Sequence, residues 1–257
     1  MNSTRNLIAY QTIVRKEVTR MLRVWTQTLL PPIVTMTLYF VVFGKFIGSQ
    51  VASIDGFSYM QFIVPGLVMM SVVMNAFMHT VSSFYFAKFQ KTLEEILVSP
   101  TPYWVVIAGY VTGGVVRSLL TGSIVLGVAL FFTRIHFAHW PTVFLFALLA
   151  AILFSLFGLI NAVFAKSFDG VFIIPNFVLT PLTYLGGVFY SIELLPAFWR
   201  SVSLWNPMVY IIDGFRYGIL GVADTDIVLA FGILVSFVCA AFLFTWWLFR
   251  TGKGLRT

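Results

Sequence analysis

Six long apolar stretches divide the chain, and each is near or above the length at which a helix can cross a membrane. A helix needs about 20 mainly apolar residues to span the hydrocarbon core. Charged residues make up 10% of the chain, whereas a soluble domain carries roughly 25%. The sequence therefore predicts an all-α polytopic membrane protein, with transmembrane helices at about 26–46, 58–83, 103–132, 141–165, 170–191 and 227–249.

Lysine and arginine are distributed unequally over the connecting segments. With the N-terminus in the cytoplasm, 11 basic residues fall on the inner side and 4 on the outer side. Because an excess of Lys and Arg marks the cytoplasmic side, both termini are expected there. The inner set is Arg5, Arg15, Lys16, Arg20, Arg23, Lys88, Lys91, Lys166, Arg250, Lys253 and Arg256, and the outer set is Lys45, Arg134, Arg200 and Arg216.

The segment 196–220 is apolar, yet it carries charges and a helix break at Asn206-Pro207. If it crossed the membrane, the chain would have seven spans and the basic C-terminal tail would lie outside, against the charge bias. We interpret it as a re-entrant helical hairpin between spans five and six, with helices at about 196–205 and 208–219. The alternative is an amphipathic hairpin that lies on the outer leaflet.

Two details support helices in this segment. Pro196 suits the first position of a helix. Asp213 and Arg216 are three residues apart, so they can pair on one helix face. Irregular backbone at membrane depth persists only where protein or a water-filled cavity covers it, so the hairpin is expected to cap or line an internal space.

Residues 1–25 predict an amphipathic helix before the first span. The apolar side chains recur at steps of three and four, and the basic ones fall largely off that stripe. We expect an interfacial helix under the membrane, although generic anchoring would give the same pattern. The stripe consists of Leu7, Tyr10, Val14, Val18, Met21 and Trp25.

A second short helix is expected at 91–99, in the loop between spans two and three. Thr92 and Glu95 have the spacing of a capping box with Thr92 as the N-cap, and the Ser99-Pro100-Thr101-Pro102 run ends the helix. A capped helix with one apolar face is a docking shape, although it could also rest on lipid headgroups. Leu93, Ile96 and Leu97 form that face.

Polar residues at helical spacing occur in two of the predicted spans. Ser71, Asn75 and His79 follow one face of span two, and a similar stripe lies on span five. Such groups usually face protein or a cavity, so the stripes are candidates for a transport pathway or a dimer interface; hydrogen bonding between helices is the alternative. The candidate pathway residues are Ser71, Asn75, Met74, Phe77, Asn176, Thr180 and Thr183.

Small residues four apart, as in Gly109-Tyr-Val-Thr-Gly113, predict close helix packing. Arg117 is an exception inside span three, because no carboxylate is expected at comparable depth in any span. We expect it to anchor the helix structurally, with an anionic headgroup as the other possibility.

The motifs together resemble one family. The runs "TLEEILVSPTP", "LTPLTYLGGVFYSIELLP" and "NPMVYIIDGFRYGILG", in this order, are similar to the ABC-2 type transporter permeases, particularly to a small subgroup of bacterial inner-membrane permeases. The resemblance covers nearly the whole chain as a single domain, 1–257. It implies a multi-pass protein of the bacterial inner membrane that forms a homodimer and pairs with two copies of a P-loop ATPase.

The resemblance also implies roles for three segments. Residues 1–25 would be the connecting helix, and the helix at 91–99 would be the coupling helix that docks on the ATPase. The 196–220 hairpin would form an outer gate. The implied coupling residues are Thr92, Glu94, Glu95, Leu97 and Ser99, and the implied gate residues are Tyr190, Glu193, Trp199, Trp205, Asp213 and Arg216.

The sequence gives no sign of chemistry in this chain. The phosphate-binding pattern G-x-x-x-x-G-K-[ST] is absent, so ATP and Mg²⁺ would be bound by the partner, and no catalytic, cofactor, metal or nucleic-acid site is expected. We predict the permease subunit of an exporter for an amphipathic, lipid-like or drug-like substrate, surrounded by membrane lipids. A secondary transporter or channel not coupled to ATP is the alternative, although carboxylates inside the spans, usual in ion-coupled transporters, are not expected.

Overall fold

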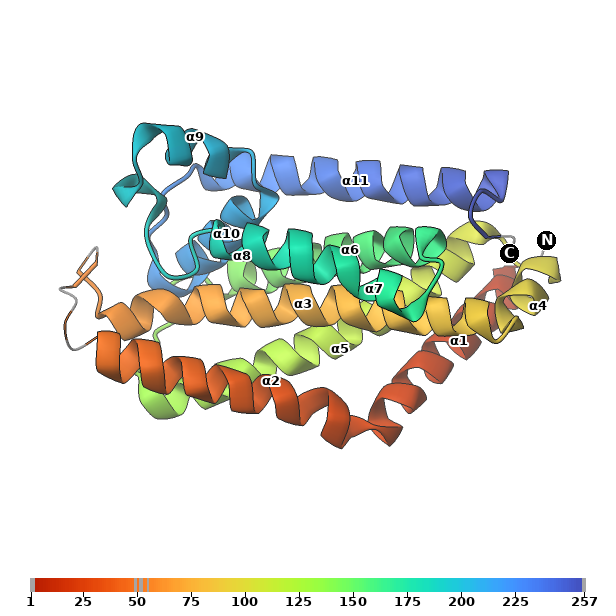
Figure 1. Ribbon diagram of the computed structural model, residues 1–257, viewed down its shortest axis with the longest axis horizontal. Coiled ribbons are helices and arrows are strands. Elements are labelled where there is room, and N and C mark those ends of the chain that lie inside the picture. Colours follow the sequence, from red (N-terminus) through yellow and green to blue (C-terminus); the bar gives the residue numbers. More distant parts are fainter. Residues whose placement is uncertain (1–2, 49, 51–52, 55, 256–257) are drawn as a thin grey trace.

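A computed structural model of the chain describes residues 3–48, 50, 53–54 and 56–255. Arg256, which entered the charge comparison, lies outside the described residues. The described chain is a bundle of roughly parallel long helices (Figure 1). α1 begins and α11 ends at the end of the bundle where α4 lies, and α9 and α10 lie at the opposite end (Figure 1).

Nearly all of the described chain is helical. Turns and short loops join the helices, and a single isolated bridge joins Ile54 and Phe57. The helices are α1 (Ser3–Arg23), α2 (Trp25–Tyr39), η1 (Phe40–Ile47), α3 (Tyr59–Phe89), α4 (Thr92–Val98), α5 (Tyr103–Phe132), α6 (Trp140–Phe164), α7 (Phe168–Ile174), η2 (Pro175–Leu179), α8 (Thr180–Tyr184), η3 (Ile192–Leu194), α9 (Ala197–Leu204), α10 (Pro207–Leu220) and α11 (Ile227–Thr251).

Five helices among the described residues are long and apolar enough to cross a membrane. They are Trp25–Gly44, Tyr59–Phe89, Tyr103–Phe132, Trp140–Phe164 and Ile227–Thr251. The second of them, α3, is the centre of the bundle, because α5, α6 and α10 all pack against it. A capping box begins α3: Ser58 Oγ accepts from Gln61 N, and Gln61 Oε1 accepts from Ser58 N, which satisfies two backbone donors at this helix end.

The stretch expected as one span at 170–191 is divided into α7, η2 and α8. Helical backbone continues through the junctions from Phe168 to Tyr184 and then ends. The expectation that helix extends to residue 191 is therefore wrong. Gly187 has φ of +78°, a left-handed conformation that suits glycine and turns the chain.

The segment 196–220, predicted as a hairpin, forms two short helices separated at Asn206. The Asn206 side chain accepts a hydrogen bond from Met208 N, and Pro207 occupies the first position of α10. Pro196 is the N-cap of α9, not its first residue as expected, since its ψ of 148° is extended. α10 packs against α3, α6 and α11, whereas α9 lies over the edge of the bundle (Figure 1).

Gly109 and Gly113 do mark close packing, but their nearest neighbour is α1, with His79 of α3 next nearest to Gly113. A Cβ built on Gly109 would lie 2.6 Å from Ile13 Cγ2, and one on Gly113 would lie 2.7 Å from Glu17 Cβ. The amphipathic helix α1 is thus fitted against α5. Its buried residues are Ile13, Glu17 and Met21, so the predicted apolar stripe is only partly the buried face, and Leu7 and Trp25 are exposed.

Candidate coupling and gating sites

The short helix α4 lies between α3 and α5. Leu93 is buried against the bundle, whereas Glu94, Glu95 and Val98 face outward, with Val98 87% exposed. A docking helix needs an apolar side chain that anchors it to its own protein and an exposed surface for the partner. Leu93 provides the first, and the acidic and apolar side chains that face outward provide the second. Leu97 and Ser99 are half-buried at its end.

The predicted capping box at Thr92 is wrong. Lys91 is the N-cap, with a left-handed φ of 61°, and Thr92 is the first helical residue. The Thr92 hydroxyl donates instead to Ala87 O at 3.2 Å, back toward the end of α3. The tight turn between α3 and α4 therefore uses the hydroxyl that would have capped α4.

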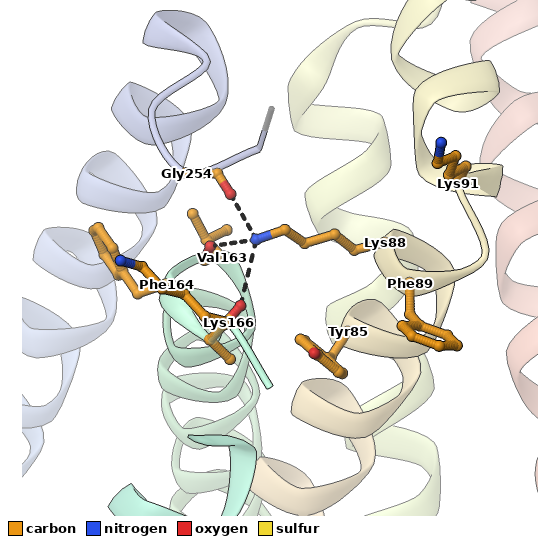
Figure 2. A pocket seen from close by; sticks show the side chains of 9 residues that line it. Tyr85, Lys88, Phe89, Lys91, Val163, Phe164, Lys166 and Gly254 are labelled. Carbon is orange, nitrogen blue, oxygen red and sulfur yellow. Dashed lines mark hydrogen bonds between the residues drawn. The ribbon is translucent and has the colours of Figure 1, made fainter. Parts of the chain in front are cut away.

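Lys88 joins three segments at the base of α4. Its Nζ donates to Val163 O at 2.9 Å, to Gly254 O at 2.7 Å and, more distantly, to Ala165 O at 3.5 Å (Figure 2). A cation is favoured at the carboxyl end of a helix, where carbonyl groups lack partners. Lys88 thus connects the end of α3 to the end of α6 and to the turn that follows α11.

A surface cavity of about 530 Å³ surrounds this lysine. In Figure 2, Tyr85 and Phe89 lie on one side of it and Phe164 on the other. Lys91 and Lys166 complete a basic rim. The Lys88 ammonium donates its hydrogen bonds to three carbonyl groups of the chain. We therefore interpret the residues around this cavity as a structural junction beneath α4.

Glu17 of α1 is buried in the bundle, with 1% of its surface exposed. Its Oε2 accepts a hydrogen bond from Ser83 Oγ at 2.5 Å and lies 3.2 Å from His79 Nε2. Burial opposes ionisation of this carboxyl, but the contacts with His79 and Ser83 and the charge of Arg20 outweigh it. They hold the pKa of Glu17 below its usual value.

Arg117 has a neighbour that the sequence did not reveal. Its Nη1 lies 3.4 Å from His79 Nδ1. Since a guanidinium can only donate, Nδ1 is the acceptor and Nε2 carries the proton toward Glu17. The expectation concerned carboxylates within the spans, and Glu17 comes from α1, outside them. Glu17 contacts the far side of the His79 ring, so it reaches Arg117 only through that histidine.

The polar stripe of α3 faces the interior of the chain. Ser71 and Asn75 are buried, and Asn75 Nδ2 donates to Ser71 O at 3.0 Å. Phe77 is also buried, whereas Met74 is half-buried. Hydrogen bonding along the helix thus accounts for Asn75.

The second polar stripe is differently placed. Thr183 is buried and donates to Leu179 O at 2.7 Å, and Thr180 donates to Pro175 O at 3.0 Å. Asn176 is exposed, on a surface shared with large apolar side chains of α7 and η2. These exposed neighbours are Phe172, Ile173, Phe177 and Val178.

The expected pair of Asp213 and Arg216 forms at the opposite end of the bundle, at 3.9 Å. Both residues are buried. Arg216 Nη2 donates to Gly187 O at 2.6 Å, and its guanidinium lies 4.0 Å from the centre of the Phe62 ring. The charge is thus held by a carboxylate, a carbonyl and an aromatic face, all of which stabilise a buried guanidinium.

Asp213 and Asp224 also fix the loops around α10. Asp213 accepts from the backbone N–H groups of Asp224 and Thr225, at 2.9 and 2.6 Å. Asp224 in turn accepts from Ser191 Oγ and Ile192 N. This network joins the loop before η3 to the loop before α11.

The other candidate gate residues lie nearer the surface. Glu193 and Arg200 approach to 3.9 Å with both side chains exposed, a contact worth little in water. Tyr190 donates to Tyr184 O at 3.2 Å. Trp199 is half exposed and Trp205 is 88% exposed. The structure therefore separates a buried anchoring pair from an exposed aromatic rim.

The architecture described above is that of a helical membrane protein, with five helices among the described residues that are long and apolar enough to cross a bilayer. Residues 8–220 match the ABC-2 type transporter family, so the chain belongs to this family. It is a transmembrane subunit without catalytic activity of its own.

Named relatives agree with this assignment. The chain is 55% identical to the inner membrane transport permease YadH of Escherichia coli (strain K12) over 97% of its own length and 98% of that protein. It is 24% identical to nodulation protein J of Rhizobium leguminosarum bv. viciae, over 80% of each chain.

Proposed function

We propose that this chain is the membrane half of an ATP-driven exporter in the bacterial inner membrane, with ATP and Mg²⁺ bound by two copies of a separate P-loop ATPase. The observation that carries the proposal is α4. It presents Glu94, Glu95 and Val98 outward, and it lies at the end of the bundle away from α9 and α10 (Figure 1). A helix that is buried against the bundle on one face and exposed on the other can transmit a movement of a bound partner to the spans.

We infer a six-span topology with both termini in the cytoplasm. The fifth crossing would be formed by α7, η2 and α8, which cover residues 168–184 without a break, about 25 Å of helix at 1.5 Å per residue. The charge bias of the loops supports this orientation. In this arrangement α9 and α10 form the outer gate, held to α3 by Arg216.

A second copy of the permease would cover the exposed surface of α7 and η2. Asn176 lies there among Phe172 and Phe177, and Phe177 is 77% exposed. A polar amide at membrane depth rarely faces lipid, so a protein surface or a water-filled path is the better neighbour. Homodimerisation would place two such surfaces along one pathway, and its apolar lining suits an amphipathic, lipid-like or drug-like substrate.

The experiment is co-purification of a tagged permease with its ATPase subunit. Glu94→Lys together with Glu95→Lys is expected to reduce recovery of the ATPase at least ten-fold, because both charges at the contact are reversed. Glu193→Lys reverses an exposed acid at the opposite end and is expected to leave recovery unchanged. Equal recovery with all variants would remove the basis for α4 docking. Failure of the unmodified permease to recover any ATPase would favour a channel or secondary transporter that does not use ATP.

A further inference from the structure

The helix α1 has a second face, opposite to the one packed on α5. Lys16, Arg20 and Arg23 follow one another at helical steps of four and three, so they lie on one side of the helix, and Arg15 is adjacent to Lys16. Together with Thr12, Thr19 and Val24 they line a surface hollow of about 560 Å³. The residues lining this basic hollow include no acid.

The orientation of this face is fixed. Glu17 and Ile13 are buried on the other side of α1, and Glu17 contacts His79 and Ser83 of α3. Rolling the helix would remove the buried carboxylate from these contacts, which is unfavourable. The basic hollow is therefore a constant feature of the surface and not one orientation of a loosely attached helix.

The charges in the hollow form no ion pair within 4 Å among the described residues, although Arg20 is close enough to Glu17 to lower the pKa of that carboxyl. Within the part of the chain that the structure describes, no ion pair involves Arg15, Lys16, Arg20 or Arg23. Arg20 is positioned by stacking, with its guanidinium carbon 5.3 Å from the centre of the Phe86 ring. Arg20 and Arg23 also lie in the last turn of α1, where a cation is favoured. Arg15 and Lys16 lie in the middle of the helix, where neither an aromatic contact nor the helix terminus accounts for a cation.

The position of the hollow indicates the kind of anion. It ends at Val24, and the first candidate membrane span begins at the next residue, Trp25, which is 54% exposed. Tryptophan at the end of a span marks the level of the lipid headgroups. The hollow is formed by the half of α1 farther from α4 (Figure 1), so it is displaced from the expected ATPase contact.

We propose that this basic hollow binds the phosphate headgroup of an anionic phospholipid of the inner leaflet. The proposal rests on the inward orientation of α1 in the proposed function, but not on ATP coupling. Clustered Lys and Arg residues on an amphipathic helix attract anionic lipids, and basic pockets beside spans on the cytoplasmic side hold their headgroups. The phosphate would lie between Arg15, Lys16 and Arg20, while the acyl chains follow the exposed side of α2.

The test is a lipid-binding measurement on purified permease in detergent, without any ATPase. Short-chain phosphatidylglycerol is expected to bind more tightly than phosphatidylcholine of the same chain length, as measured by native mass spectrometry. Arg15→Gln with Lys16→Gln is expected to weaken phosphatidylglycerol binding by roughly 25-fold, at about five-fold for each charge. Arg5→Gln with Lys253→Gln removes two exposed charges outside the hollow and is expected to change phosphatidylglycerol binding less than two-fold.

Several results would overturn the proposal. Equal binding of the two lipids by the unmodified protein would do so, and this comparison needs no variant to fold. Inorganic phosphate that displaces phosphatidylglycerol at equal concentration would indicate a site for free anions. Loss of ATPase co-purification in the Arg15→Gln, Lys16→Gln protein, with lipid binding unchanged, would assign the face to the partner subunit. None of these outcomes depends on whether the chain exports a substrate.

Discussion

Glu17 Oε2 on α1 lies 3.2 Å from His79 Nε2 on α3, so a carboxylate of the N-terminal amphipathic helix is buried against the central helix of the bundle. Arg117 on α5 approaches the other nitrogen of the same imidazole. Three helices therefore meet through one histidine. This contact makes α1 a fixed part of the bundle and gives the first prediction.

Glu17→Ala is expected to destabilise the permease by about 1–3 kcal/mol, because it removes the charge-assisted hydrogen bond from Ser83 and the electrostatic contact with His79. The midpoint of thermal unfolding in detergent measures the effect. Glu95→Ala removes an exposed acid of the same size and is expected to leave that midpoint within error. Equal midpoints for the two variants would show that the buried contact contributes nothing.

Stability should also depend on pH through Glu17. Its pKa is lowered from about 4.5 by the fold, so the stabilisation is fully present above the unfolded value and is lost as pH falls through the lower, folded value. The unfolding midpoint should therefore fall more steeply below pH 4.5 in the unmodified protein than in Glu17→Gln. Parallel curves for the two proteins would contradict this assignment.

Gly113 and Gly127 give a matched pair on α5. A Cβ on Gly113 would lie 2.7 Å from Glu17 Cβ, whereas one on Gly127 would meet nothing within 4 Å. Gly113→Ala is expected to cost about 1–3 kcal/mol of stability through overpacking, and Gly127→Ala is expected to be neutral or slightly stabilising. Unfolding midpoints compare them, and a neutral Gly113→Ala would mean that α1 can move away from α5.

Lys88→Met is expected to loosen the turn after α11, because Gly254 O then loses its donor. Hydrogen–deuterium exchange of the peptide that contains residues 252–255 should become faster, as should exchange at the end of α6. Lys91→Met removes a neighbouring exposed lysine and serves as the control. Unchanged exchange in both variants would show that other contacts hold the tail.

Cysteine labelling tests the proposed topology in a Cys239→Ala background. Trp205→Cys, on the exposed outer rim, should react with a membrane-impermeant maleimide added to intact cells. Lys253→Cys, beyond the last span, should react only after the cells are opened. Labelling of Lys253→Cys from outside would place the C-terminus on the wrong side and contradict the six-span layout.

The sequence predicted those features that depend on local spacing. Five of the six apolar stretches form long helices, the Asn206-Pro207 break separates α9 from α10, and Asp213 and Arg216 pair at three residues apart. Each of these follows from helix geometry or from the backbone limits of proline, so neighbouring residues are sufficient to predict them.

Features that depend on tertiary packing were not predictable in this way. Arg117 contacts His79, and His79 in turn contacts Glu17. These three residues come from three separate helices. The Thr92 capping box failed because a left-handed Lys91 turned the chain and redirected the hydroxyl to Ala87. The proposed fifth crossing ends before residue 191, at a turn in which Gly187 O accepts a hydrogen bond from Arg216 of α10.

The fit between Gly113 and Glu17 has an evolutionary consequence. The space that a Cβ at position 113 would occupy is already taken by the Cβ and Cγ of Glu17, so position 113 cannot enlarge while the two helices keep this distance. In homologous permeases a residue larger than glycine at position 113 is therefore expected only where position 17 is glycine or the two helices lie farther apart.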